Sequence, residues 1–330
     1  MSSKIGKKNV FLKDIPCFKE NINVISECFC FELYNKFTSF RTFSNILLLV
    51  YADIENYLVF FDLEKNIVFK RINSCHEEAV SLIYHHKDLR KNNDLIVTIS
   101  SADFNSKIWD ISSFQLVANL TDIYENGFIE SCCFINYNLN IFLAFANNNN
   151  NISDKIKIIN IENNDNFTID NNGPFTLKIL TFNDKSKTYI VVCNYESIIS
   201  YNMNTLSIFQ KYIDNEASWN LSDMELFLFD SKPKLLGCEE RGVLKIWDFY
   251  SKLLNHKIKS PYGSNICLWN ELFLIIAGLS NLYILDLRTL KISSSFNLFD
   301  NWKPISVIEH SKFGKCLLYQ KKTNIGILHN

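Results

Sequence analysis

The five residues Ser106-Lys107-Ile108-Trp109-Asp110 recur, with one change, as Leu244-Lys245-Ile246-Trp247-Asp248. Each copy ends a short apolar stretch, and each is followed by a polar turn and then by another short apolar stretch. Similarity between distant parts of a chain is typical of repeat architectures, in which one structural unit occurs several times. The same pattern is therefore expected elsewhere in the chain.

A large apolar residue marks the same place in seven segments. Successive anchors are 48, 50, 42, 46, 38 and 43 residues apart. A β-propeller blade of four short strands takes roughly 40–45 residues, and insertions lengthen its loops. The spacing predicts seven blades within one propeller that spans residues 1–330. The seven anchors are Phe61, Trp109, Ile159, Tyr201, Trp247, Leu285 and Leu328.

Short apolar stretches between the anchors predict four strands in each blade. In the second blade these are residues 80–85, 95–101, 106–110 and 115–120. In the first blade they are residues 24–31, 46–51, 57–62 and 67–71. Strands at this spacing, separated by turns, indicate an all-β fold. The composition agrees, since 27 Phe residues and an aromatic content of 14% favour strands.

The two ends of the chain predict how the ring closes. The last blade has three apolar stretches, and the sequence stops two residues after its anchor, Leu328. Residues 8–13 form a strand-like stretch with no place in the first blade. An open ring would leave unpaired strand edges. Residues 8–13 are therefore expected to complete the last blade as its outer strand and to close the seven-bladed propeller.

Charge and cysteine content narrow the classes of function. The net charge is −1, whereas binding to nucleic acid or to an anionic membrane needs a basic face, so neither partner is expected. No apolar run approaches the ~18 residues that span a bilayer. The 10 cysteines are scattered, which fits buried thiols in a reducing compartment better than a disulfide framework. The N-terminus lacks an export signal, so we expect a cytoplasmic protein, with the nucleus as an alternative.

Residues 101–110 resemble a WD-repeat signature. Asp103 precedes Trp109 by six residues, as in that family, and Asp110 completes the Trp-Asp pair. The resemblance implies that His76, Asp103, Trp109 and a strand Ser or Thr form a buried hydrogen-bonded set. The expected Ser/Thr position is Ile99, with Thr98 beside it, so the sequence predicts an incomplete set.

The second copy of the repeat, at residues 244–248, matches fewer features of the family signature. It keeps Trp247 and Asp248, but Arg241 stands where the turn Asp would be. This blade is therefore not expected to form the same polar set. The other five blades match only in their period and their strand pattern.

No catalytic, cofactor or metal site emerges from the sequence. His85 and His86 are neighbours on a predicted strand, so they point to opposite faces and do not favour one shared metal ion. The other histidines are isolated, and there is no phosphate-binding loop or nucleophile elbow. We therefore expect a protein that is not an enzyme and has no cofactor.

The propeller fold, together with the lack of a recognisable catalytic, cofactor or metal site, predicts a scaffold or adaptor that binds other proteins or peptides. It would act as one monomer within a hetero-complex and would bind through the top face of the propeller, because rigid frames present binding residues on loops. The residues expected to contact partners are Ala102, Phe104, Asn194, Tyr195, Glu240, Arg241 and Lys321.

Three alternatives stay open. One is a reader of modified peptides, which needs a cage or pocket at the channel mouth. Another is a substrate receptor of a ubiquitin ligase, because residues 285–288 resemble part of a Trp-Asp-x-Arg box in which Leu285 replaces the Trp. The third is a propeller enzyme, which would need histidines or carboxylates at equivalent positions of successive blades.

Overall fold

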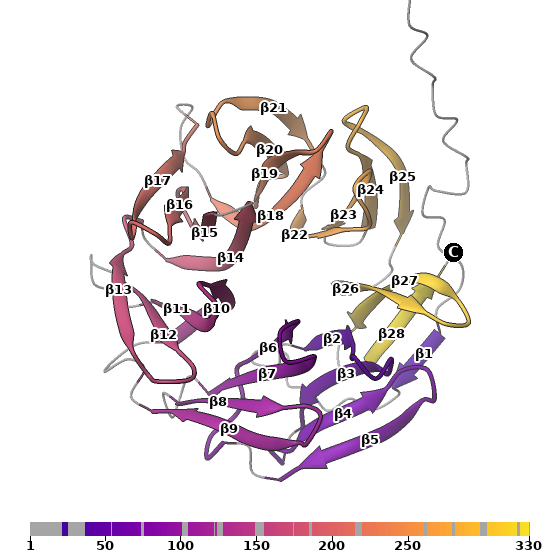
Figure 1. Cartoon of the computed structure of the whole chain (residues 1–330). Helices are drawn as coiled ribbons and strands as arrows, with labels where there is room; N and C mark the ends of the chain where they lie inside the picture. Colours follow the sequence, from indigo (N-terminus) through magenta and orange to yellow (C-terminus); the bar gives the residue numbers. More distant parts are fainter. Residues whose placement is uncertain are drawn as a thin grey trace, which may run out of the picture.

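A computed structural model of the protein describes residues 22–25, 37–53, 55–73, 76–100, 105–121, 123, 128–148, 155–173, 175–184, 187–214, 220–260, 263–278, 281–297, 302–321 and 324–329. These residues form seven four-stranded antiparallel sheets and no helix. Figure 1 shows the sheets arranged as blades around a central axis. The predicted all-β, seven-bladed propeller is confirmed.

The first three blades each use four consecutive strands, which run in order from the innermost strand outward. Blade 1 contains β2 (Thr38–Arg41), β3 (Leu47–Ala52), β4 (Leu58–Asp62) and β5 (Ile67–Ile72). Blade 2 contains β6 (Leu82–Asp88), β7 (Asn93–Ser100), β8 (Asn105–Asp110) and β9 (Gln115–Leu120). Blade 3 contains β10 (Phe128–Tyr137), β11 (Asn140–Asn148), β12 (Lys155–Asn160) and β13 (Asn166–Asp170).

Blades 4 to 6 repeat this order. Blade 4 contains β14 (Thr176–Asp184), β15 (Lys187–Asn194), β16 (Ile198–Asn202) and β17 (Ser207–Tyr212). Blade 5 contains β18 (Leu221–Phe229), β19 (Lys232–Glu239), β20 (Val243–Asp248) and β21 (Leu254–Lys259). Blade 6 contains β22 (Gly263–Leu268), β23 (Phe273–Gly278), β24 (Asn281–Asp286) and β25 (Lys291–Asn297).

Blade 7 is the one that joins the two ends of the described chain. Its inner strands are β26 (Trp302–His310), β27 (Gly314–Lys321) and β28 (Asn324–His329), and its outer strand is β1 (Ile22–Ile25). β1 pairs antiparallel with β28, with Ile22 opposite Ile327 and Ile25 opposite Ile325. An N-terminal strand therefore closes the ring, as predicted.

The position of the closing strand differs from the expectation. Residues 22–25 occupy the edge of β28, where residues 8–13 were expected, and residues 8–13 lie outside the described residues. Consequently the predicted first strand of blade 1, residues 24–31, is also wrong, because β2 takes that place. Short apolar stretches have similar strand propensity, so the pairing partner decides which one is used.

The core is divided into layers between consecutive blades. Seven buried apolar clusters are present among the described residues, and each joins one blade to the next, including blade 7 to blade 1. Since the middle strands are buried on both faces, they read as continuous apolar runs, such as Leu47–Ala52. All seven anchors lie in the third strand of a blade and are buried.

The residue that follows each anchor caps the next turn, which explains why Asp recurs after the anchor in the repeated segments. In six blades it is Asp or Asn, and its Oδ1 accepts the backbone N–H two residues later, at 2.7–3.2 Å. The residue four positions later has a positive φ of 52–62° in every case. Side-chain capping of this kind stabilises a tight turn. The six capping residues are Asp62, Asp110, Asn160, Asn202, Asp248 and Asp286.

Candidate functional site

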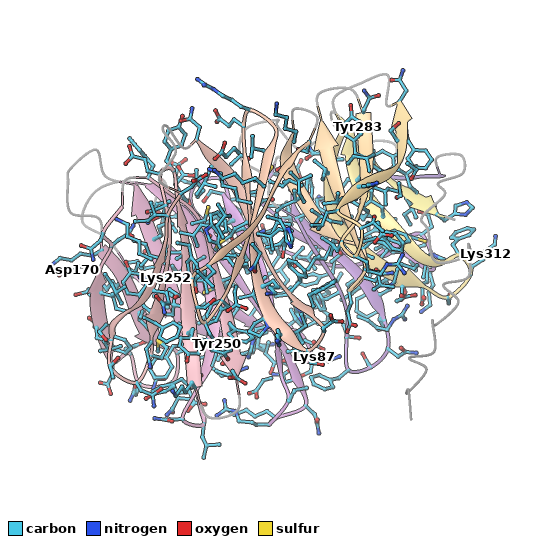
Figure 2. All side chains as sticks on the ribbon, turned by 90° about the horizontal axis from the view of Figure 1, so that it is seen from above. Lys87, Asp170, Tyr250, Lys252, Tyr283 and Lys312 are labelled. Atoms are coloured by element: carbon cyan, nitrogen blue, oxygen red, sulfur yellow. The ribbon has the colours of Figure 1, made fainter. Side chains whose placement is uncertain are left out.

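Two kinds of connection emerge on one face of the ring, because neighbouring strands are antiparallel. They are the turns between the second and third strands and the connections between blades; we call this face the loop face. The opposite face carries the remaining hairpin turns, and we call it the turn face. The edge-on view in Figure 2 places Tyr283, near the beginning of β24, toward one face and Lys87 and Tyr250 toward the other.

The predicted contact residues on the loop face differ in accessibility. Glu240 and Arg241 are exposed in the β19–β20 turn, and Tyr195 is half-buried. Asn194 is fully buried, so its side chain is not available to a partner. The main chain of Lys321 pairs with Trp302 and Asn324. Ala102, Asp103 and Phe104 lie outside the described residues.

A buried hydrogen-bonded set holds the loop that enters blade 2. Trp109 donates its indole N–H to Oγ1 of Thr98 at 2.9 Å, and Nε2 of His76 lies 2.9 Å from the same oxygen. The Thr98 hydroxyl faces the Lys107 carbonyl at 3.4 Å, which leaves its oxygen free to accept from both rings. Thr98, and not Ile99, therefore provides the hydroxyl of the set. The prediction of an incomplete set is wrong for His76, Thr98 and Trp109, which are joined by hydrogen bonds.

Blade 5 replaces this set with an ion-pair cluster. Gly237 stands opposite Lys245, as Thr98 stands opposite Lys107 in blade 2. A Cβ at Gly237 would come within 3.1 Å of Trp247, so a hydroxyl-bearing side chain does not fit there without a shift. Instead, Nζ of buried Lys245 lies 2.9 Å from Asp214.

Two further side chains complete the cluster of blade 5. Glu239 forms a second ion pair with Lys245, and Lys257 reaches Asp214 at 2.8 Å. Arg241 is exposed and belongs to no ion pair among the described residues, which agrees with the expectation that this blade lacks the polar set of blade 2. The cluster ties the connection from blade 4 to the strands of blade 5.

In blade 4, uncharged side chains hold the connection that enters the blade. Nδ2 of Asn171 donates to Thr176 at 2.8 Å and to Asn194 at 3.0 Å, and Asn194 donates back to Asn171 at 3.1 Å. The hydroxyl of the anchor Tyr201 donates to the carbonyl of Asp170 at 3.3 Å. Buried polar groups that satisfy one another in this way fix one arrangement of the loop.

Charged side chains cross between blades along the inner wall. Lys178 on β14 lies 2.9 Å from Asp223 and 3.1 Å from Glu225, both on β18. Asp223 also accepts the backbone N–H of Ile266, on β22, at 3.0 Å. This cluster therefore connects the innermost strands of three consecutive blades, which Figure 1 shows around the centre of the ring.

The ionisation of this cluster follows from its burial. Burial by itself lowers the pKa of Lys178, but the two carboxylates outweigh it and hold that pKa above its usual range. Burial raises the pKa of Glu225, although Lys178 opposes the shift. The lysine is therefore a fixed cation committed to the blade junctions and is not a nucleophile at neutral pH.

The junctions on the other side of the ring use different groups. Nε2 of His85 donates to the Asp94 carboxylate at 2.8 Å, and the His85 ring stacks on Phe40 of blade 1, with ring centroids 3.6 Å apart. Arg41 reaches Glu64 at 2.8 Å and donates to the Glu309 carbonyl of blade 7 at 2.6 Å. The hydrogen-bonding groups of these side chains therefore bind other residues of the propeller.

The described residues offer little reactive chemistry. Burial raises the pKa of Cys316 to about 11 and the pKa values of Cys238 and Cys267 to about 12, so these thiols are protonated at neutral pH. Thiols in that state are poor nucleophiles. Within the described ranges, no three His, Cys, Asp or Glu side chains are placed to hold a metal ion together.

The faint resemblance at residues 285–288 leads to an internal contact. Arg288 donates to both oxygens of Asp286, at 3.0 and 2.7 Å, and lies over the ring of Phe273. The guanidinium group therefore stabilises its own turn. Nothing in this geometry directs Arg288 outward to a partner.

Comparison with protein-family models and with curated proteins finds no match for this chain. In the described part of the chain, no helix is long and apolar enough to cross a membrane. Membership in the WD-repeat family therefore stays a prediction from the sequence, while the seven-bladed fold is seen in the structure.

Proposed function

We propose that this chain is a non-catalytic scaffold or adaptor that binds other proteins through its loop face, as one subunit of a larger complex. The observation that carries the proposal is the locking of the loop face from within. Three connections, into blades 2, 4 and 5, are held by buried polar sets of different chemistry. Loops fixed on a stiff frame lose little entropy when they bind, which favours recognition.

The described surface supports binding more than reaction. Lys178 and Lys245 are paired with carboxylates inside the frame. The exposed residues of the β19–β20 turn, Glu240 and Arg241, have no ion-pair partner among the described residues. Unpaired surface charges on a fixed turn are suited to choosing a partner by charge. We extend the proposal to a cytoplasmic location and to a monomeric state within the complex.

Affinity purification of the full chain, followed by quantitative mass spectrometry, tests the proposal. The double variant Glu240→Lys/Arg241→Glu keeps the net charge of the turn but reverses its pattern. Lys252→Glu, on the exposed β20–β21 turn of the opposite face, is the control. We expect the double variant to lose at least one partner that the control retains.

Equal partner sets for the wild type, the double variant and the control would contradict a role for this turn of the loop face. A purified chain that turns over a substrate would contradict the non-catalytic assignment. Both variants are at exposed turn positions, so circular dichroism and melting temperature should match the wild type and exclude misfolding as the cause.

A further inference from the structure

The outermost strands of blades 1 and 2 expose apolar side chains where those of blades 3 to 6 expose mostly polar ones. The five residues are 40–53% exposed, and we call them the rim patch: Ile67, Val68 and Phe69 on β5, and Leu116 and Val117 on β9. Single exposed apolar residues are ordinary, but five on the outer strands of two consecutive blades are not.

The other blades provide an internal comparison. The exposed side chains within β13 and β21 are polar, and β17 and β25 each expose one large aliphatic residue, Ile208 and Ile292. Further exposed aliphatic residues occur beside these strands, but in the turns and connections: Leu206, Ile213 and Leu253. The position at the rim therefore does not require an apolar surface. The rim patch is a property of blades 1 and 2 and not of the fold.

Phe114 of blade 2 packs against the part of the rim patch that lies on β5. It lies in the β8–β9 turn, directly before β9, with a positive φ of 56°. Its ring centroid is 5.9 Å from that of Phe69 and 5.1 Å from that of buried Phe60. The turn of blade 2 thus packs onto the outer strand of blade 1 and extends the apolar surface of β5.

The patch coincides with a strand edge that has hydrogen-bonding capacity. β5 pairs with β4 along one edge, and no described strand pairs with its other edge. An apolar strand with an open edge is a template for an added strand, which gains main-chain hydrogen bonds as well as apolar contacts.

One cation on β5 has no carboxylate partner among the described residues. Arg71 is neutralised by Asp53, and Lys65, in the turn before β5, lies 3.5 Å from Asp62. Lys70 instead lies over the ring of Phe114, with Nζ 5.8 Å from the centroid. An occupant of the rim patch would therefore gain from a carboxylate near Lys70.

We propose that the rim patch binds an extended segment of a partner protein, which adds a strand to the open edge of β5. The segment carries apolar side chains at alternate positions, because side chains of a strand alternate between its faces. It also carries a carboxylate opposite Lys70. This site is separate from the loop face and does not depend on the function proposed for it.

A second copy of this chain is a less suitable occupant. Pairing of two β5 strands would bring Lys70 and the nearby Lys65 of both copies close to one short strand pair, and β5 itself supplies no carboxylate. Like charges that face each other across a strand pair are destabilising. The charge pattern therefore favours a different, acidic segment.

A peptide display experiment on the immobilised full chain tests the proposal. The probe is a library of nine-residue peptides that alternate apolar and variable positions between acidic ends. Counter-selection uses the variant Val68→Thr/Leu116→Thr, which places strand-compatible polar side chains at exposed positions. We expect peptides that bind the wild type at least tenfold more tightly than this variant.

Charge reversal sharpens the test. Lys70→Glu should weaken the acidic peptides at least tenfold, and Lys-for-Glu versions of the same peptides should regain binding. Ile292→Thr on β25, at a comparably exposed position of another outer strand, is the matched control and should leave the affinity unchanged. Proline at a central position of the peptide should abolish binding, because it removes a backbone donor.

Three outcomes would overturn the proposal. The first is no peptide enriched on the wild type over the Val68→Thr/Leu116→Thr variant. The second is binding that neither this variant nor Lys70→Glu changes. The third is sedimentation that shows a dimer of the wild type which Val68→Thr dissolves, since this would assign the edge to self-association. Loss of loop-face partners would affect none of these results.

Discussion

The indole nitrogen of Trp109 lies 2.9 Å from the hydroxyl oxygen of Thr98, and both side chains are buried, with the tryptophan in the apolar layer between blades 1 and 2. Their strands are neighbours in blade 2, so this contact links β7 to β8 beneath the connection that carries His76. The tryptophan of the repeat is thus a hydrogen-bond donor to a particular hydroxyl as well as an apolar anchor.

Thr98→Val should destabilise the protein by about 1–3 kcal/mol, because it leaves the buried rings of Trp109 and His76 without this hydroxyl while keeping the shape of the side chain. Urea unfolding measures the change. Thr98→Ser, which keeps the hydroxyl, should cost less. Thr168→Val on the exposed β13 position is the control, and an equal loss at Thr98 and Thr168 would contradict the role of the hydroxyl.

Two N-terminal deletions should separate the closing strand from the residues before it. Removal of residues 1–15 should leave the melting temperature nearly unchanged, because β1 begins at Ile22. Removal of residues 1–25 should lower it sharply and promote association, because the edge of β28 becomes unpaired. A large loss already in the shorter deletion would place the closing strand nearer the N-terminus.

A glycine opposite the closing strand gives an independent check. Gly326 pairs with Asn23, and a Cβ there would collide with the Tyr319 hydroxyl of the neighbouring strand. Gly326→Ala should therefore destabilise blade 7, by an amount comparable to overpacking in a core, about 1–3 kcal/mol. Gly326→Ala should cost less in a Tyr319→Leu background, because the ring and hydroxyl that a Cβ would meet are then gone. Thermal unfolding of the two single variants and the double variant measures both effects.

The cap of blade 5 predicts a dependence of stability on pH. Backbone hydrogen bonding from Ser251, with help from Lys234, lowers the pKa of Asp248 from 3.8 to about 2. Because the folded pKa lies below the unfolded one, this stabilisation is present above about pH 4 and is lost as the pH falls toward 2. Asp248→Asn should make the decline in unfolding free energy between pH 5 and 2 shallower.

The neutral caps show that this substitution can be tolerated. Asn160 and Asn202 occupy the same turn position in blades 3 and 4 and accept the same backbone hydrogen bond. Asp248→Asn should therefore fold normally at pH 7. Asp230→Asn, in an exposed turn, serves as the control for charge alone. A pH profile that Asp248→Asn leaves parallel to that of the wild type would contradict the stabilising role of this carboxylate.

The inner-wall cluster should show strong coupling. Lys178→Met leaves Asp223 and Glu225 without their cation and should cost about 2–4 kcal/mol, less than for a fully buried charge because the lysine is 28% exposed. Adding Glu225→Gln should recover part of that loss. A double-mutant cycle measures the coupling, and losses that add to within about 0.5 kcal/mol would show that the two side chains act independently.

The period of the anchors was enough to predict the seven blades, because every anchor occupies the same place in its sheet. The face of a side chain was harder to predict. Ile99 and Thr98 are adjacent, and a shift of one residue turns a strand position to the other face. Thr98 shares its face with Trp109, as their partners Lys107 and Ile96 show, and Ile99 does not.

Contacts between blades could not be predicted from the sequence. Lys178 and Asp223 are 45 residues apart, and neither lies in a recognisable motif. Asp214 and Lys245 meet because two consecutive blades pack together, and their chemistry differs from that of blade 2. The closing strand was misplaced for a related reason, since short apolar stretches are similar in local propensity and the pairing of residues 22–25 with β28 is a long-range contact.

Cross-linking mass spectrometry of the native complex shows which face of the ring contacts a partner, because lysines report on each surface separately. Lys155 and Lys259 lie at strand ends on the loop face, and Lys87 and Lys252 lie on the turn face. We expect intermolecular cross-links from Lys155 or Lys259 to a protein partner. Cross-links confined to Lys87 and Lys252, or no cross-linked partner at all, would contradict a scaffold that binds through its loop face.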